Sequence, residues 1–551
     1  MSDSDKIQLL ERQTELLQKQ LKEIKDEIAR SRKKSEQIEA RRKSDEVDTG
    51  QIEARRKSEE VDTVSAAIPV APARPVPTKA PLLPEGVKVT LGGFLAAESV
   101  FRQRNEAADI GSSFTGIPYP FSPLFNENEF HASARQSRIS LLLEGNLDPL
   151  QKLTGYYEMD FLGVGQSSNF NQSNSWAPRL RQAFVEYDNK GWGFHVLGGQ
   201  AWSLLTQTTT GITARKENPP LTIDPNYVVG FNYTRNWQIR LVEEFGPAFS
   251  AGISVEAPAA IVGGSAATGP VGTGFSTPFV SGNAVNGLLV NFSNVGSGGF
   301  LNGVTVTTDV APDVIGKLAF DPGWGHYEVF GVQRTFNDNV LNCFPVACTT
   351  GSISITGSPS QKTTFGGGVG GSVLVPIVQK YVDFTGNLLY GRGIGRYGSG
   401  QLPDVTIASD GSLTPLTGLT AMVGLIGHPW EGLDVYGYAG IEQVNANSFN
   451  TPAGPFGFGN PGFSNGGCNT TSGLSFSSGA APVNCAANNN NRRLSEITGG
   501  FWQNIYKGEY GRLAVGAQYE YIKRESFDGV GGPVSTADNV ILTSLRYYPF
   551  P

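Results

Sequence analysis

The sequence predicts an all-β transmembrane barrel of 16 antiparallel strands, preceded by an N-terminal α-helical coiled coil. Two observations predict the barrel. From residue 87 onward, short segments alternate apolar and polar residues, and the connections between them are short and long in strict alternation. A third observation predicts the coiled coil, because apolar residues near the N-terminus recur with heptad spacing. The chain therefore divides into a helical oligomerisation segment (1–64), a linker (65–86) and the barrel (87–551).

The head of the chain has its own composition. Residues 1–64 hold 15 Lys and Arg and 16 Asp and Glu, whereas the remaining 487 residues hold 28 and 34. The 13-residue segment 37–49 is repeated almost unchanged at 51–63, a period of two heptads. Isoleucine at both seam positions of the heptad favours a coiled coil of three helices over one of two. A single charged helix or a disordered arm is the alternative. The seam consists of Ile7, Leu10, Thr14, Leu17, Leu21, Ile24 and Ile28.

The linker is rich in proline. Six prolines stand within the 16 residues from Pro69 to Pro84. Proline fixes φ and has no N–H to donate, so this stretch is expected to be an extended, semi-rigid spacer.

The strands of the barrel show two unlike faces. In 138–148, Ile139 and Leu141 alternate with Arg138 and Ser140. The segment 153–163 alternates in the same way, with Tyr157, Met159 and Phe161 on one face and Tyr156, Glu158 and Asp160 on the other. Such alternation places one face in an apolar medium and the other in water.

The connections determine the strand count. Eight long polar stretches begin near residues 103, 164, 203, 257, 337, 393, 447 and 525. Seven short turns lie between them, at 147–151, 188–193, 234–237, 321–325, 376–380, 428–432 and 506–509. Seven turns alternating with eight loops give 16 strands, and Trp192, Trp324 and Trp430 beside the turns fit an interfacial aromatic belt. A soluble propeller or solenoid would need a repeat of about 40 residues, and none is found.

Other classes are disfavoured. No apolar run reaches about 18 residues, so no transmembrane helix is encoded. The net charge of −7 gives no reason to expect nucleic-acid binding. The four histidines, at 131, 195, 326 and 428, show no metal-ligand spacing, and no hydrolase or phosphate-loop motif appears. We therefore expect no enzyme, no resident metal and no cofactor; an outer-membrane hydrolase would be revealed by a His or Ser substitution that changes hydrolytic activity.

The four cysteines form two close pairs in polar, loop-like sequence. An even count at short spacing predicts the disulfides Cys343–Cys348 and Cys468–Cys485 and an oxidising compartment. Four free thiols are the alternative.

Four segments of the chain resemble a known family. The segments at 134–145, 155–163, 179–203 and 543–550 are similar to the trimeric outer-membrane porins, most closely the DcaP-like group. The resemblance implies a homotrimer in the bacterial outer membrane, in contact with lipids that include lipopolysaccharide, with the coiled coil in the periplasm. It also implies a water-filled channel for the passive diffusion of small hydrophilic solutes.

The resemblance further implies a basic wall in the channel, opposite a third loop that folds inward. Arg138 and Arg181 are the best candidates for that wall. The third loop carries two cations where cation-selective porins concentrate acids, which points to anions such as small carboxylates. The pore candidates are Arg138, Arg181, Arg179, Arg135, Glu158, Asp160, Arg215, Lys216 and Glu217. For each arginine, the alternative is a strand-end pair with a carboxylate or a lipid phosphate.

A structural protein is the second functional hypothesis. In it the coiled coil tethers or spaces the envelope, and loops plug the barrel. The N-terminal residues lack an apolar signal-peptide core, so a processed chain or an upstream start is expected. At the other end, Ile541, Leu545 and Tyr547 are expected to face lipid and Ser544 and Arg546 the lumen, with the last three residues outside the sheet.

Overall fold

The computed structural model describes the barrel segment of the chain. The chain divides into Met1–Leu82 and Leu83–Pro551. The coiled coil, most of the linker and the pair Cys343–Cys348 lie outside the described residues and stay predictions. The described residues are Pro84, 86–163, 177–264, 288–291, 293–295, 305–342, 360–451, 454–471 and 485–550.

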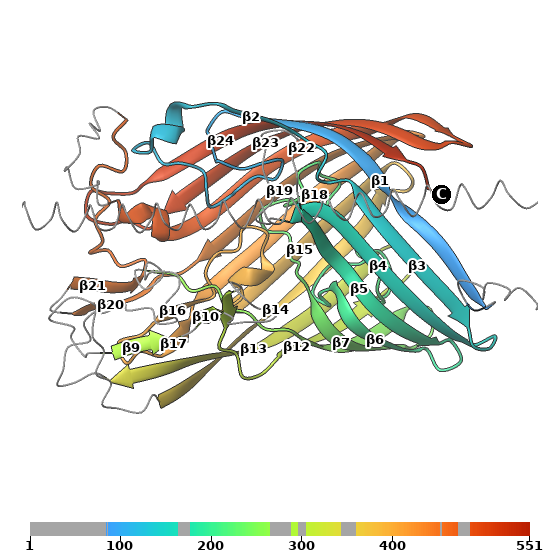
Figure 1. Cartoon of the computed structure of the whole chain (residues 1–551), viewed down its shortest axis with the longest axis horizontal. Helices are drawn as coiled ribbons and strands as arrows, with labels where there is room; N and C mark the ends of the chain where they lie inside the picture. The colour runs from blue at the N-terminus through green and yellow to red at the C-terminus, as the bar shows by residue number, and fades with distance from the viewer. Residues whose placement is uncertain are drawn as a thin grey trace, which may run out of the picture. The chain divides into compact units, whose positions relative to one another are not determined.

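One antiparallel sheet closes into a barrel (Figure 1). Eighteen strands belong to the sheet; β2 continues the line of β3 along β1, and β9 only extends the edge of β13 beyond β12, so 16 strands circle the barrel. The chain closes where β1 pairs with β24, from Leu95↔Tyr547 to Arg102↔Val540. The strands are β1 (Val87–Arg102), β2 (Glu129–Ser133), β3 (Arg138–Asn146), β4 (Gln151–Gly163), β5 (Ala177–Asn189), β6 (Phe194–Trp202), β7 (Arg235–Glu244), β8 (Phe249–Glu256), β9 (Leu288–Asn291), β12 (Asp313–Phe320), β13 (His326–Asn342), β14 (Ser360–Val378), β15 (Val382–Arg392), β18 (Thr417–Trp430), β19 (Leu433–Val444), β22 (Asn491–Gly508), β23 (Gly511–Ser526) and β24 (Ser535–Tyr548).

The two faces of the strands meet different media, as the alternation predicts. In β24, Ile541, Leu545 and Tyr547 are exposed on the outer surface, whereas Ser544 is buried and Arg546 points inward to Glu98. Pro549 and Phe550 follow the end of the strand, as expected. Period-two alternation thus sorts apolar side chains outward and polar ones inward.

Seven short turns lie at one end of the barrel, on the right in Figure 1. Six of the seven were correctly placed, and Trp192, Trp324 and Trp430 stand exposed beside them. The turn expected at 234–237 was wrong, because Arg235 and Trp237 pair with Trp202 and Gln200 inside the ladder. The chain turns instead at 245–248, where Gly246 takes the positive φ of 75° that glycine tolerates.

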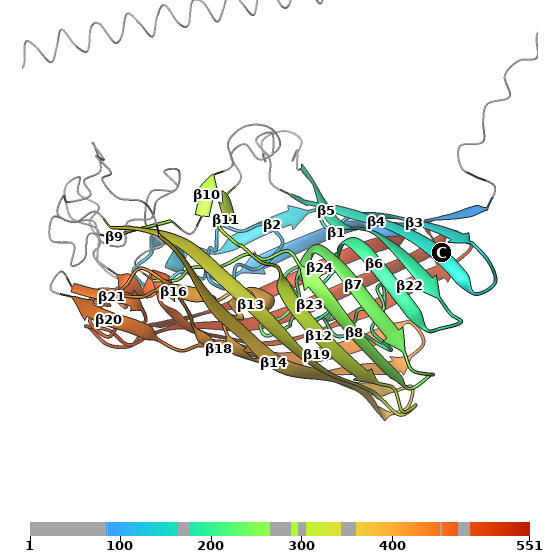
Figure 2. The same ribbon diagram turned by 90° about the horizontal axis from the view of Figure 1, so that it is seen from below.

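Eight long connections lie at the opposite end, and strand β13 runs five residues further into that end than expected. Small elements within the connections include η1 (Pro123–Asn126), β10 (Ser293–Val295), β11 (Thr305–Thr307), β16 (Val405–Ile407), β17 (Leu413–Pro415), η4 (Gly395–Tyr397), β20 (Asn447–Thr451), β21 (Gly454–Phe458) and η5 (Ala486–Asn489). In Figure 2, β20 and β21 lie at this end of the barrel, on the left. Among the described residues no helix is long and apolar enough to cross a membrane.

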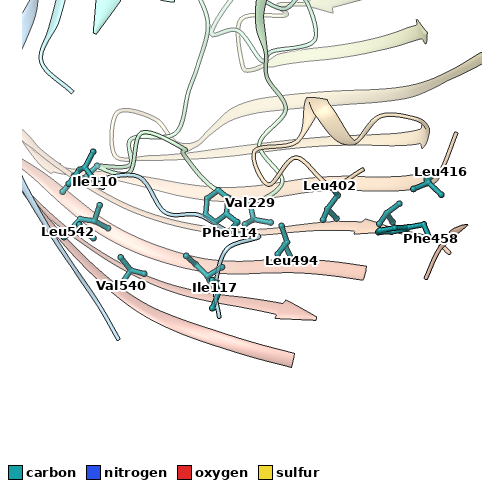
Figure 3. Close-up of a cluster of buried hydrophobic side chains, with 14 residues drawn as sticks. Ile110, Phe114, Ile117, Val229, Leu402, Leu416, Phe458, Leu494, Val540 and Leu542 are labelled. Atoms are coloured by element: carbon teal, nitrogen blue, oxygen red, sulfur yellow. The ribbon is translucent and has the colours of Figure 1, made fainter. Parts of the chain in front are cut away.

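Parts of these connections fold into the barrel and pack there. Figure 3 shows the cluster that results. Ile110, Phe114 and Ile117 come from the first loop (103–128), and Ile223 and Val229 from the third loop (203–234). They pack against residues of two later loops and against inward side chains of the wall: Val100, Leu402, Leu416, Val444, Phe458, Leu494, Ile522, Val540 and Leu542. The long-loop half of the interior therefore contains an apolar core.

Candidate functional site

We call the side of the barrel that contains β19, β22 and β23 the far wall and the side that contains β1, β3, β4 and β5 the near wall. The third loop crosses the interior and is hydrogen-bonded to the far wall. The indole N–H of Trp502 donates to the Leu221 carbonyl at 2.7 Å, and the Leu221 N–H donates to the Tyr438 hydroxyl at 3.1 Å. From the near wall, the Gln136 amide donates to the Ile223 carbonyl at 2.6 Å. Bonds from both walls fix the backbone of the loop across the lumen.

Inward carboxylates on neighbouring strands β19, β22 and β23 hold the rest of this loop. We call Glu442, Glu496 and Glu520 the acidic row. Glu442 accepts the Gly230 N–H at 2.8 Å, and Glu496 accepts the Val229 N–H at 2.8 Å. Glu520 holds the first loop, since it accepts the Ser112 hydroxyl at 3.1 Å. The acidic row is therefore occupied by loop backbone and hydroxyl donors.

Ser112 also joins the two loops to each other. Its N–H donates to the Asp224 carboxylate of the third loop at 2.9 Å. Burial raises the pKa of Asp224 to about 6, because removal from water disfavours the charged form. The first and third loops thus meet around a buried carboxyl group.

A cavity of about 480 Å³ lies between the third loop and the near wall. Residues 219–225 of the loop form one side, and strands β1, β3, β4, β5 and β6 with the neighbouring β22, β23 and β24 form most of the rest. The cavity reaches the short-turn end, where Asp434, Asn504 and Arg512 line it. Its aromatic lining consists of Phe94, Tyr156, Trp202, Tyr227, Trp502 and Tyr548.

Four predicted residues meet on adjacent strands β4 and β5. Arg181 donates to Glu158 at 2.6 Å and to Asp160 at 3.0 Å, and its side chain is 2% exposed. Arg179 donates to both carboxylate oxygens of Asp160, at 2.9 and 2.7 Å. Arg181, Glu158 and Asp160 line the cavity, but their charges are largely satisfied by one another.

Arg138 also lines the cavity and is less engaged. Its nearest carboxylate oxygen belongs to Glu158, at 3.8 Å, and its Nε has no hydrogen-bond partner. The guanidinium lies 5.2 Å from the centre of the Phe94 ring, and the side chain is 29% exposed. An anion in the cavity can therefore reach this guanidinium without first breaking a short ion pair.

Two further arginines of the cavity were absent from the predicted pore residues. Arg546 pairs with Glu98 at 2.8 Å and lies over Trp502. Arg512 stacks on Tyr548 at 3.8 Å and donates to the Asn504 side chain at 3.3 Å. Within the described part of the chain, Arg512 has no carboxylate partner. Arg546 belongs to β24, which pairs with β1 where the barrel closes, and Arg512 belongs to the neighbouring strand β23.

The remaining predicted residues lie away from the cavity lining. Arg135 donates to Asp109 at 2.6 Å and to the Phe161 carbonyl at 3.1 Å. In the third loop, Arg215 lies 5.2 Å from the Tyr156 ring, and Lys216 is 3.9 Å from Glu244. Glu217 is half-buried, and removal of its carboxyl group from water raises its pKa.

Solved structures match the chain at the level of fold. The outer membrane channel DcaP of Acinetobacter baumannii matches with a TM-score of 0.53 and 17% identity, covering 84% of this chain and 97% of that chain. The anion-selective porin of Comamonas acidovorans matches with a TM-score of 0.41 and 11% identity, over 84% and 99%. OmpF of Salmonella typhi in complex with daunomycin gives 0.42 and 8%, over 84% and 98%. No protein-family model and no curated protein sequence matches.

The chain has a porin fold. Its closed ring of 16 strands, its inward third loop and the DcaP match agree on this. A structural similarity at 17% sequence identity establishes the fold of this chain and not its function.

The predicted disulfide Cys468–Cys485 is formed. Both cysteines belong to a cluster with Tyr119 of the first loop and Val534. The bond therefore fastens one long loop where it packs against another.

Proposed function

We propose that the chain forms an outer-membrane channel for passive diffusion of small hydrophilic solutes and that it favours anions such as small carboxylates. The observation that carries this proposal is Arg138, a lumen-facing guanidinium without a short ion pair in the cavity beside the third loop. Arg512 adds a second cation toward the short-turn end. A fixed cation on a narrow wet path raises the local concentration of anions.

The position of the acidic row supports the proposed preference for anions. The chain beyond residue 64 has more acids than bases, so an anion preference depends on where the acids point. Glu442 and Glu496 bond the third-loop backbone and do not line the cavity. Of the acids that do line it, Glu158 and Asp160 are paired with Arg181. The loop thus covers acids of the far wall.

The assembly proposed with this function is a homotrimer in the bacterial outer membrane, in contact with lipopolysaccharide. The short turns then face the periplasm, and residues 1–64 form the periplasmic coiled coil, joined by the 65–86 linker. The heptad spacing supports the coiled coil and the trimer, and the porin fold supports the outer-membrane location.

A structural role is the second candidate, and the apolar core inside the barrel favours it. Ile110, Phe114, Ile117, Ile223 and Val229 pack within the long-loop half. If this core leaves no wet path, the barrel is an anchor for the coiled coil and conducts no ions.

The deciding experiment is planar-bilayer recording under a salt gradient. We expect conductance steps with a reversal potential that shows anion preference. A charge about 5 Å from the ion path contributes about 0.8 kcal/mol in water, which favours an anion and disfavours a cation by the same amount, so Arg138→Gln should lower the anion-to-cation permeability ratio about 16-fold.

Arg179→Gln is the matched control, because it removes the same charge on strand β5 outside the cavity lining. An equal shift in both variants would refute the assignment of Arg138. Absence of conductance in the folded wild-type protein would reject the channel and leave the anchor.

A further inference from the structure

Three histidines at the short-turn end share one arrangement. In each, Nδ1 contacts an aspartate close by: His195 and Asp188 at 2.6 Å, His326 and Asp321 at 2.7 Å, His428 and Asp434 at 2.6 Å. All three have a second carboxylate near Nε2. The spacing of the histidines themselves does not reveal this arrangement, because each aspartate lies across or within a short turn from its histidine.

The His195 site differs from the other two at Nε2. In His326, Nε2 is hydrogen-bonded to Glu328 at 3.0 Å and to Thr208 at 3.1 Å, and in His428 it contacts Asp383 at 3.4 Å. Nε2 of His195 is buried without a hydrogen-bond partner, and the nearest carboxylate oxygen, on Glu244, is 3.6 Å away. A buried ring nitrogen without a partner loses its hydration uncompensated.

A further carboxylate, that of Glu186, lies in the same cluster. Glu186 is 6% exposed, and its carboxylate has no hydrogen bond within the described part of the chain. Glu186, Asp188 and His195 each offer one ligand atom, and these atoms lie within 4.8 Å of one another. The cations nearby do not satisfy Glu186: the Arg240 guanidinium donates to Gln238 and to two backbone carbonyls, and Lys216 is turned to Glu244.

We propose that this cluster binds a divalent transition-metal ion of the Zn²⁺ class. His195 Nε2 and Glu244 would be ligands, Glu186 would join them as its side chain turns toward Nε2, and Asp188 would orient the imidazole through Nδ1. Imidazole with carboxylates is a donor set that suits Zn²⁺, Co²⁺ and Mn²⁺, and a carboxylate on the far ring nitrogen commonly orients a metal-binding histidine.

The contact between His195 and Glu244 has a spacing that suits such an ion. Two ligands at about 2.1 Å from a tetrahedral ion are about 3.4 Å apart, close to the 3.6 Å between Nε2 of His195 and the Glu244 oxygen. Exposure rises from 6% at Glu186 to 11% for the His195 side chain and 36% for that of Glu244. The cluster is therefore open at Glu244, where a hydrated ion can arrive.

The test uses Co²⁺ as a spectroscopic probe of the full-length protein, purified in detergent and freed of metal by a chelator. We expect visible d–d absorption that saturates at one Co²⁺ per chain and disappears when Zn²⁺ is added. His195→Gln and Glu186→Gln should abolish the absorption, and Asp188→Asn should weaken binding about 10- to 100-fold.

His428→Gln is the matched control, because it removes a histidine held between two aspartates at the same end of the barrel. It should leave the absorption unchanged. Folding of each variant is verified by circular dichroism and by heat-modifiable mobility on gels, and Glu186→Gln decides the question if His195→Gln does not fold. Failure of the wild-type protein to bind Co²⁺ at millimolar concentration, or an undiminished signal in folded Glu186→Gln, would overturn the proposal.

Discussion

Glu442→Ala should release the third loop from the far wall. The Glu442 carboxylate accepts the N–H of Gly230 at 2.8 Å and that of Gly400 at 2.7 Å, and the residue is 1% exposed. Alanine leaves both donors buried without an acceptor, at about 1–3 kcal/mol each. Gly230 belongs to the third loop and Gly400 to the connection after β15, so each attachment should weaken by about 1–3 kcal/mol, and the lower limit corresponds to about five-fold faster opening.

The assay is amide hydrogen exchange of the detergent-solubilised protein, read on the peptides that contain Gly230 and Gly400. Glu442→Gln is the control, because its amide oxygen still accepts both bonds while the buried charge is removed. We expect fast exchange in the alanine variant and wild-type exchange in the glutamine variant. Wild-type exchange in Glu442→Ala, or equal acceleration in both variants, would refute the role of this carboxylate as an anchor.

Three further predictions concern the loops and the interior of the barrel. Arg334→Met should destabilise the protein by about 3–5 kcal/mol, because it leaves the Asp404 carboxylate, now 2.6 Å from the guanidinium, buried without its cation; an unchanged temperature for loss of heat-resistant gel mobility would contradict this. Replacing Cys468 and Cys485 by serine should remove about 3 kcal/mol of loop restraint and speed proteolysis within 445–490, with the melting of the strands unaffected. Burial raises the pKa of Glu106 in the first loop to about 8, so the folded protein holds a proton that the unfolded chain releases above about pH 4.5. The stability that this proton gives is complete below that pH and is lost as pH rises to about 8. The thermal unfolding temperature of the wild-type protein should therefore fall more steeply with rising pH than that of Glu106→Gln.

The sequence was most informative where a local rule decides the outcome. Strict alternation in 138–163 placed Arg138, Glu158 and Asp160 on one face of their strands, and in the structure these side chains line the cavity. The alternation of short and long connections gave the strand number, because a hairpin barrel places its two classes of connection at opposite ends. One turn was misplaced because Asn236 and Trp237 have turn-like composition but occupy ladder positions.

The rest depends on contacts between residues distant in sequence. Arg512 reaches the cavity only because β24 closes on β1, and Gly230 finds Glu442 across 212 positions. The cluster around His195 depends partly on local sequence and partly on strand pairing. Glu186 and Asp188 share the inward face of one strand, and the short turn that follows pairs Asp188 with His195. Two carboxylates at i and i+2, followed across a tight turn by a histidine, were therefore a signal that the sequence contained.

The apolar core of the interior also left a trace in the sequence. Near the long-loop end, β24 has Val540, Ile541 and Leu542 in succession, so both faces of the strand are apolar there. Ile541 faces outward, whereas Val540 and Leu542 are completely buried inside. A strand that borders an open, water-filled lumen needs no apolar residue on its inner face, so loss of alternation at one end of a barrel strand indicates loops packed against that end. Any solute path through this half must therefore run beside the packed loops, and Arg138 and Arg512 lie on the side of the third loop where the cavity is.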